Sequence, residues 1–297
     1  MKIQYSPEVE KAIKDHQPLV ALETAVLTHG LPIPQNIELS LSLEDEVRQA
    51  GAVPATVGLL DGELHVGLTL QEVERLGQAE PGTRKVSRRD FGVTIARKEN
   101  GGTTVAATMI AAHLAGIKVF ATGGIGGVHR NAPMDVSADL IELGRTPVLV
   151  VCAGAKAILD LPLTMEVLET QGVPVIGYQT NELPAFYSIS SGLPLNIRVD
   201  RPEEAMEIAK TQWEAGLSTG VLVVVPPPAD VAVPREKIEG IIEQAVHEAE
   251  EKHIIGSKVT PFLLSRVAEL SGGESMKANL ALLRNNARLA AQIARCV

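Results

Sequence analysis

Two side chains draw attention first because each follows a short apolar run. Glu23 comes directly after the run Pro18–Leu22, and Lys156 comes three residues after the run Pro147–Ala153. Desolvation at such a position disfavours the charged ammonium of a lysine, and a neutral amine can attack a carbonyl carbon to form a Schiff base. A carboxyl group in the same kind of position can hold a proton and act as a general acid. Position alone leaves other interpretations open. Lys156 could lie in the first turn of a surface helix, and Glu23 could cap a helix or loop or pair with a buried arginine.

Two further segments could bind an anion. Gly123–Gly127 follows an apolar run, and the exposed backbone N–H groups of such a segment bind phosphate. It lacks the last glycine of a dinucleotide fingerprint and the Gly-Lys-Ser/Thr of a P-loop, and a tight turn packed under a helix is the alternative. Lys85–Asp90 is a small basic cluster that suits a phosphate or, equally, a solvated turn with local ion pairs.

A short acidic segment could bind a metal ion. Asp135, Ser137 and Asp139 are predicted to lie within one helical turn. Two carboxylates and a hydroxyl there suit a divalent cation held by one carboxylate and waters, or sugar hydroxyls accepted by Asp139. An ordinary helix N-terminus explains the same residues. The seven histidines have no zinc spacing, so no zinc site is expected.

The composition predicts a large apolar core and excludes some classes of partner. Of the 297 residues 45% are apolar but only 3% aromatic, so the core is expected to consist of Val, Leu, Ile and Ala. A net charge of −9 argues against nucleic-acid binding, which depends on Lys and Arg. No run reaches the ~18 apolar residues of a membrane span. Two unpaired cysteines and a polar N-terminus lead us to expect a cytoplasmic protein.

Apolar runs of strand length alternate with amphipathic stretches along the chain. Asp61-Gly62 separates two extended runs and predicts a hairpin, so one part of the sheet should be antiparallel. The C-terminal third is mostly helical, with Thr260-Pro261 predicted to begin one helix and Ser275 to cap the last. We expect a single domain over residues 1–297. Its predicted class is α/β, three-layer α/β/α, with a mixed, mostly parallel central sheet and a helical C-terminal region.

Several short segments, in order along almost the whole chain, belong together. They are Ala21–Thr24, Thr28–Gly30, Pro34–Asn36, Gly51–Thr56, Lys85–Asp90, Thr103–Met109, Phe120–Arg130, Asp135–Leu140, Val151–Lys156, Thr260–Leu264 and Arg284–Leu289. Together they resemble the pseudouridine-5′-phosphate glycosidases (pseudouridylate synthases), the family that includes the indigoidine synthase A-like proteins. Matches this numerous are far more specific than any single motif.

The resemblance implies roles for individual residues. Lys156 corresponds to the nucleophile, Glu23 to the proton donor, and Asp135 to the ligand of one Mn²⁺ ion per subunit. It also implies a homotrimer. The positions that it implies for substrate binding are Lys85, Val105, Ser137, Ala138, Asp139 and Asn279.

The implied reaction is the reversible cleavage of pseudouridine 5′-phosphate to uracil and ribose 5-phosphate. Ordinary glycosidases protonate a leaving oxygen, but a carbon leaving group has no lone pair to protonate. An iminium between C1′ and a lysine supplies an electron sink instead. The rival hypotheses are an aldolase-like Schiff-base enzyme acting on another sugar phosphate, a pyridoxal-phosphate enzyme that uses Lys156, and a non-catalytic sugar-phosphate sensor.

Overall fold

The apolar runs form one central sheet in the computed structural model, which describes residues 2–254 and 259–297. Its main path runs β1-β4-β3-β2-β7-β10-β14-β12-β13, with β6 attached to β3 and β5 attached to β6. The pairs from β3 through β2 to β13 are parallel, whereas β4 and β6 run antiparallel to β3. The predicted mixed, mostly parallel sheet is confirmed. Its strands are β1 (Ile3–Tyr5), β2 (Leu19–Leu22), β3 (Val53–Leu60), β4 (Glu63–Val66), β5 (Arg84–Val86), β6 (Gly101–Thr103), β7 (Val119–Ala121), β10 (Leu149–Cys152), β12 (Val175–Tyr178), β13 (Ile197–Val199) and β14 (Val221–Val224).

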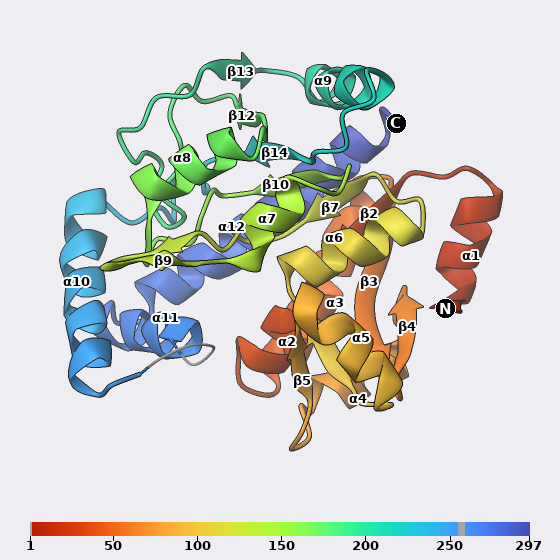
Figure 1. Ribbon diagram of the computed structural model, residues 1–297, viewed down its shortest axis with the longest axis horizontal. Helices are drawn as coiled ribbons and strands as arrows, with labels where there is room; N and C mark the ends of the chain where they lie inside the picture. Colours follow the sequence, from red (N-terminus) through yellow and green to blue (C-terminus); the bar gives the residue numbers. More distant parts are fainter. Residues whose placement is uncertain (1, 255–258) are drawn as a thin grey trace.

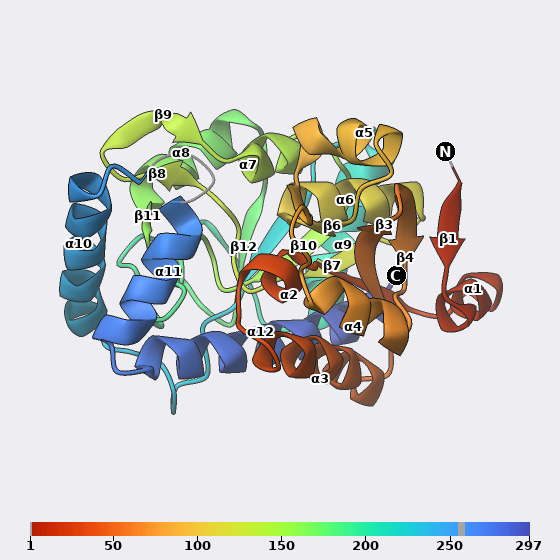
Figure 2. The same cartoon turned by 90° about the horizontal axis from the view of Figure 1, so that it is seen from below.

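Helices cover both faces of this sheet (Figure 1). Figure 2 shows α5 (Arg88–Ala96), α6 (Val105–Leu114), α7 (Ala138–Leu143) and α8 (Leu161–Thr170) along one face, and α3 (Gln35–Gln49) and α12 (Glu274–Ala294) along the other. The three-layer prediction and the helical C-terminal region are confirmed. The remaining helices are α1 (Pro7–Lys14), α2 (Ala25–His29), α4 (Leu70–Gly77), α9 (Pro202–Glu214), α10 (Arg235–Glu251) and α11 (Val259–Leu270).

Burial on both faces explains why the central strands are continuously apolar. Every residue of β10 and β14 is buried, as expected for parallel strands that have helices on both sides. α12 packs across β2, β7 and β10, and many of its buried side chains are alanines, whose small size lets the helix approach the sheet closely. This close approach brings α12 to the edge where β2, β7 and β10 end.

A smaller antiparallel sheet lies beside this edge. It has the order β11-β8-β9, formed by β8 (Val128–His129), β9 (Ala132–Val136) and β11 (Leu159–Asp160). In Figure 1, β9 extends toward α10, and α10 packs against α11. Figure 2 shows α10, α11 and this small sheet on one side of the molecule, with α2 nearer its centre.

Local signals predicted the hairpin correctly and two helix starts wrongly. Asp61 and Gly62 join β3 to β4 with φ values of +52° and +77°, the left-handed conformations that a tight hairpin turn requires. Thr260 is already helical and so does not cap α11. α12 begins after Gly273, whose φ is +87°, and Ser275 lies inside the helix. No helix in the described part of the chain combines the length and the apolar character needed to cross a membrane.

Gly62 and Gly116 offer a matched test of the hairpin packing. Both have φ = +77°, but a Cβ on Gly62 would lie 2.6 Å from the carbonyl oxygen of Ile95, whereas one on Gly116 would meet nothing within 4 Å. We expect Gly116→Ala to lower the free energy of unfolding by about 1–2 kcal/mol through backbone strain alone. Gly62→Ala should cost ~1–3 kcal/mol more because of the clash. Urea unfolding measures both changes. Equal losses in the free energy of unfolding would show that the close approach to Ile95 does not destabilise Gly62→Ala.

Candidate active site

A cavity of about 610 Å³ opens at the carboxyl edge of the central sheet. Ligands bind at this edge in open α/β sheets because the loops there diverge. The cavity is enclosed by α2, β5, the first turns of α5, α6 and α7, the glycine-rich segment, α11 and α12. All the site residues predicted from the sequence line it: Glu23, Lys85, Val105, Asp135, Ser137, Ala138, Asp139, Lys156 and Asn279.

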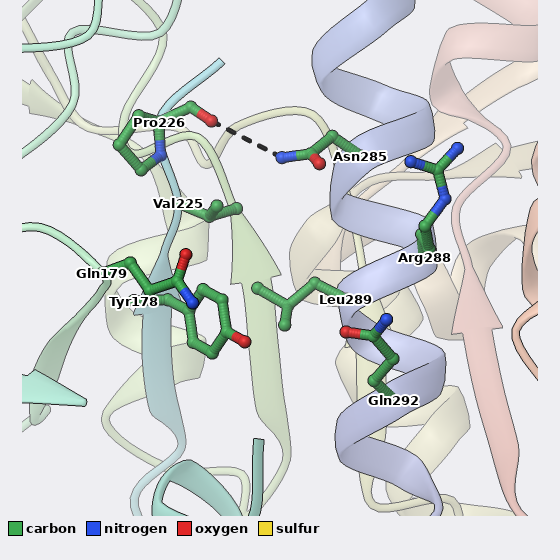
Figure 3. A pocket seen from close by; sticks show the side chains of 8 residues that line it. All are labelled: Tyr178, Gln179, Val225, Pro226, Asn285, Arg288, Leu289 and Gln292. Atoms are coloured by element: carbon green, nitrogen blue, oxygen red, sulfur yellow. Dashed lines mark hydrogen bonds between the residues drawn. The ribbon is translucent and has the colours of Figure 1, made fainter. Parts of the chain in front are cut away.

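A second cavity, of about 340 Å³, lies between α12 and the ends of β12 and β14 (Figure 3). It is lined by Tyr178, Pro226 and Asn285 among others, and by none of the predicted site residues. Figure 3 shows the Asn285 amide directed at the carbonyl oxygen of Pro226, at a distance of 3.5 Å. The predicted chemistry therefore belongs to the larger cavity alone.

The backbone at Glu23 is held by buried threonines. Thr24 is fully buried, and its hydroxyl donates a hydrogen bond to the carbonyl oxygen of Val57, 2.6 Å away. The same hydroxyl accepts one from the backbone N–H of Thr103, at 3.0 Å. These bonds link the end of β2 to β3 and β6. Glu23 is thus placed by a rigid strand end and lies in no helix cap.

Lys156 lies in an irregular segment between β10 and β11, so the surface-helix alternative is wrong. Its backbone N–H donates to the carbonyl oxygen of Ile125 at 3.1 Å, and the N–H of Ile125 donates to Gly154 at 3.1 Å. Gly154 has φ = +88°, and a Cβ there would lie 2.6 Å from the carbonyl oxygen of Pro184, so a side chain is excluded. The segment that carries Lys156 is therefore fixed to the glycine-rich segment.

Four ionisable side chains of opposite sign influence one another in the cavity. Burial raises the pKa of Glu23, while the positive charge of Lys156 and a hydrogen bond from the Thr122 hydroxyl act in the opposite direction. Burial and the charge of Lys156 lower the pKa of Lys85, and the carboxylates of Glu23 and Asp139 oppose that shift. The cavity thus holds two carboxyl groups and two amines. The upward shift in the pKa of Glu23 favours the protonated form that an acid catalyst needs.

Asp135, Ser137 and Asp139 do not share a helical turn as predicted. Asp135 is exposed on β9, and Ser137 caps α7, accepting a hydrogen bond from the N–H of Asp139 at 3.2 Å. Asp139 is buried, and its two oxygens accept hydrogen bonds from the N–H of Ala106 at 3.0 Å and that of Gly126 at 2.8 Å. The Asp139 carboxylate therefore joins the N-terminus of α6 to the glycine-rich segment. Its contact with a substrate stays a prediction.

The glycine-rich segment is closely packed, as the alternative interpretation expected. A Cβ on Gly126 would lie 2.2 Å from the Ser137 hydroxyl, and one on Gly124 would lie 2.6 Å from the ring of Phe186. Phe186 has φ = +61°, a strained conformation for a residue with a side chain, and it lines the cavity. Nothing in the sequence marks Phe186. Glycine is needed here for close packing around the cavity.

The basic cluster holds the cavity wall through a buried carboxylate. Arg88 donates to Glu142 on α7, with 2.7 Å between Nη2 and Oε1, and Glu142 is fully buried. Arg89 is exposed. Neither Glu142 nor Thr122, which lies beside Glu23, was predicted from the sequence. Thr122 had a usable signal, since it is a polar residue that ends an apolar run just as Glu23 does.

The three remaining predicted positions border the cavity from different helices. Val105 is the buried first residue of α6, Ala138 is the first residue of α7, and Asn279 is partly buried on α12. Residues at the first turn of a helix offer free backbone N–H groups, which suit an anionic or carbonyl ligand. Their types alone carried no functional signal.

The described residues contain no group of three or more His, Cys, Asp or Glu side chains that could hold a metal ion. Asp135 is exposed at the cavity and provides one carboxylate. Mn²⁺ and Mg²⁺ accept oxygen ligands and often take most of them from water and phosphate. The donors present therefore suit an ion shared between Asp135, water and a phosphorylated ligand, and they do not form a closed protein cage.

The chain is similar to known proteins over almost its whole length. The family model of indigoidine synthase A-like proteins matches residues 8–296. The chain belongs to the indigoidine synthase A-like family. Among family members, the pseudouridine-5′-phosphate glycosidase of Escherichia coli K12 is 52% identical, over 99% of this chain and 95% of its own length. That of Herpetosiphon aurantiacus is 54% identical, over 99% and 97%.

Solved structures show the same fold. The crystal structure of an indigoidine synthase A-like protein from Thermotoga maritima has a TM-score of 0.89 and 36% identity, covering 98% of this chain and 95% of that one. Prealnumycin C-glycosynthase AlnA, solved in complex with ribulose 5-phosphate, has a TM-score of 0.91 and 39% identity, covering 99% and 96%. The predicted resemblance to the pseudouridine-5′-phosphate glycosidases and the predicted fold are both confirmed.

Asp139 and Asp135 provide a matched pair for testing the internal bridge. Asp139→Asn replaces one acceptor oxygen with an NH₂ group that faces a backbone N–H, so the free energy of unfolding should fall by about 2–3 kcal/mol. Asp135→Asn, on an exposed residue four positions away, should change it by less than about 0.5 kcal/mol. Urea unfolding without ligands measures both values. Similar values for the two variants would contradict the bridging role of Asp139.

Proposed function

We propose that this protein catalyses the reversible cleavage of the C–C bond of pseudouridine 5′-phosphate to uracil and ribose 5-phosphate, with Lys156 as nucleophile and Glu23 as acid. The observation that carries the proposal is the meeting of these two side chains, with Lys85, in one cavity at the carboxyl edge of the sheet. Relatives of at least 50% identity over nearly the whole chain are named for this activity. A further relative was solved with a sugar phosphate bound.

The chemistry follows from the absence of a lone pair on the leaving carbon. The amine of Lys156 bonds to C1′ as the bond from C1′ to the ring oxygen breaks, and Glu23 gives its proton to that oxygen. The nitrogen, cationic after its attack, gives up a proton, and C5 of uracil takes one up. The nitrogen lone pair then forms the iminium as the C1′–C5 bond breaks and uracil leaves. Water adds to the iminium, which restores the free lysine and releases ribose 5-phosphate. The reverse sequence makes pseudouridine 5′-phosphate.

Phosphate binding would fix the ribose chain for this reaction. In our proposal Asp135 holds one Mn²⁺ ion per subunit, which would supply positive charge for the phosphate. Lys85 would add a further charge. In our proposal Val105, Ser137, Ala138 and Asp139, which line the cavity at the starts of α6 and α7, also bind the substrate. Asn279 approaches from α12. Binding energy from the phosphate can then hold C1′ in a reactive position.

We also propose that the protein acts in the cytoplasm as a homotrimer of single-domain chains.

The rival hypotheses predict different products or signals when the protein is given pseudouridine 5′-phosphate. An aldolase-like enzyme would form a Schiff base on another sugar phosphate and release none. A pyridoxal-phosphate enzyme would show the cofactor's absorbance near the visible range. A sugar-phosphate sensor would turn over no substrate at all.

Uracil release separates these hypotheses, and two lysines of the same cavity serve as a matched pair. The wild type should release uracil from pseudouridine 5′-phosphate, and Lys156→Ala should lower kcat on the order of 10³-fold or more, because the covalent step is lost. Lys85→Ala should act mainly on KM. Since burial lowers the pKa of Lys85, the wild-type KM should rise with pH as this charge is lost, and the variant should lack that rise. No uracil release by the wild type, or full activity in Lys156→Ala, would refute the proposal.

Metal removal tests the role of Asp135. Chelation and Asp135→Asn should each raise KM about tenfold or more, the equivalent of ~1.4 kcal/mol of binding. Asp230→Asn, on an exposed residue outside the cavity, is the control. The spin-resonance signal of free Mn²⁺ should fall when the wild type or the control is added together with ribose 5-phosphate, but not with Asp135→Asn. An unchanged rate after chelation would show that Asp135 holds no functional metal.

A further inference from the structure

Among the described residues, the hydroxyl of Thr122 is the only group that hydrogen bonds the Glu23 side chain. The contact follows from strand register. β2 and β7 are parallel neighbours in which Leu22 pairs with Ala121, so the next residue of each strand, Glu23 and Thr122, stand side by side. Thr122 is 2% exposed, so bulk water does not compete for its hydroxyl. The sheet itself therefore aims this donor at the carboxylate.

A buried amide on α12 fixes Thr122. Nδ2 of Asn286 donates to the carbonyl oxygen of Thr122 at 2.8 Å and to that of Gly123 at 3.3 Å. From the other side, the N–H of Thr122 donates to the carbonyl oxygen of Val151 at 3.0 Å. The peptide after β7 is thus held between β10 and α12.

The orientation of this amide is dictated by its surroundings. Asn286 is fully buried, and its Oδ1 has no hydrogen-bond partner among the described residues. Turning the amide over would place Oδ1 against two carbonyl oxygens, which is worse than leaving it unpaired. A buried, half-satisfied amide costs stability, and in native proteins such groups call for a specific explanation. Here both of its donated bonds hold the segment that carries the hydroxyl donor to Glu23.

We infer that Thr122 and Asn286 are positioning residues for the acid: Asn286 fixes the end of β7, and Thr122 holds the Glu23 carboxyl in one orientation. This inference rests on the proposed role of Glu23 as the proton donor. Neither residue needs to touch the substrate. Their joint effect is to keep one oxygen of Glu23 bonded to the protein and leave the other for proton transfer.

The contact has a definite effect on the titration of Glu23. The charged groups that face Glu23 are Lys156, Lys85 and Asp139, and the hydrogen bond from Thr122 adds to the lysines in stabilising the carboxylate. Removing the hydroxyl therefore raises the pKa of Glu23 further. If the protonated form is the active one, activity then persists to higher pH, although each turnover is slower because the carboxyl group is less well oriented.

The experiment combines kinetics with a direct titration. Thr122→Val removes the hydroxyl at nearly constant shape, Thr122→Ser keeps it, and Asn286→Leu removes the amide. Asn285→Leu is the control, because the amide of Asn285 is directed at Pro226 (Figure 3) and not at Thr122 or Gly123. For each protein the pH profile of uracil release is measured. The Glu23 carboxyl is titrated in the free protein by ¹³C NMR, its signal being identified by its loss in Glu23→Gln.

We expect Thr122→Val to raise two midpoints by about 1 pH unit. They are the pH at which activity falls on the alkaline side of the profile and the midpoint of the Glu23 titration by NMR. The same variant should lower kcat about tenfold. Thr122→Ser and Asn285→Leu should stay near the wild type, and Asn286→Leu should shift in the same direction as Thr122→Val. If Thr122→Val and Asn286→Leu both lose activity while the pKa of the Glu23 carboxyl stays at its wild-type value, the two residues have a purely structural role and the inference is overturned. If Thr122→Val does not fold, Asn286→Leu decides alone. If the wild type releases no uracil, the proposed function fails, while the NMR titration still tests the positioning.

Discussion

The site depends on keeping four ionisable groups in one poorly solvated cavity. Glu23, Asp139, Lys85 and Lys156 lie close enough to influence one another, and two positive charges balance two negative ones. An isolated charge in such a place would be neutralised or expelled, whereas a balanced set can stay. Burial raises the pKa of Glu23 and lowers that of Lys85, and in each case the neighbouring opposite charges oppose the shift. Removing one member should disturb the others.

The fold meets this constraint with strand ends and helix starts. β2, β7 and β10 are parallel neighbours, so Glu23, Thr122 and the segment leading to Lys156 emerge at one edge. Asp139 joins the first turn of α6 to the glycine-rich segment, and the small residues of α12 let Asn286 reach the end of β7. Each side chain to which we assign a catalytic role is thus held by backbone that buried hydrogen bonds fix. Such rigidity matters because small errors in placing a reacting atom cost large factors in rate.

The same packing explains the last segment of the resemblance, Arg284–Leu289. Arg284 and Arg288 bond to Ser42 and Glu46 of α3 on the outer side of α12. Asn286, between them, points inward to the glycine-rich segment. One short stretch therefore attaches α12 to α3 and to the site at once.

The sequence predicted the features that depend on near neighbours. The Asp61-Gly62 hairpin, the buried strands and the α/β class follow from local patterns, and the end of an apolar run marked both Glu23 and Lys156. Features that depend on distant segments could not be predicted from the sequence. They are Gly273 in place of Ser275 at the start of α12, Asp135 on a strand, Asp139 bonded to α6, and the Phe186 ring against Gly124. Val105 and Asn279 were named only through the family resemblance, because neither type carries a chemical signal by itself.

The covalent role of Lys156 can be tested by mass analysis of a trapped intermediate. The protein is incubated with Mn²⁺ and pseudouridine 5′-phosphate, reduced with borohydride, digested and sequenced by mass spectrometry. We expect the peptide containing Lys156 to gain the mass of a reduced ribose 5-phosphate adduct, and Lys156→Ala to gain none. Uracil release without any adduct on the wild-type peptide, or an adduct on Lys85 instead, would show that Lys156 is not the nucleophile.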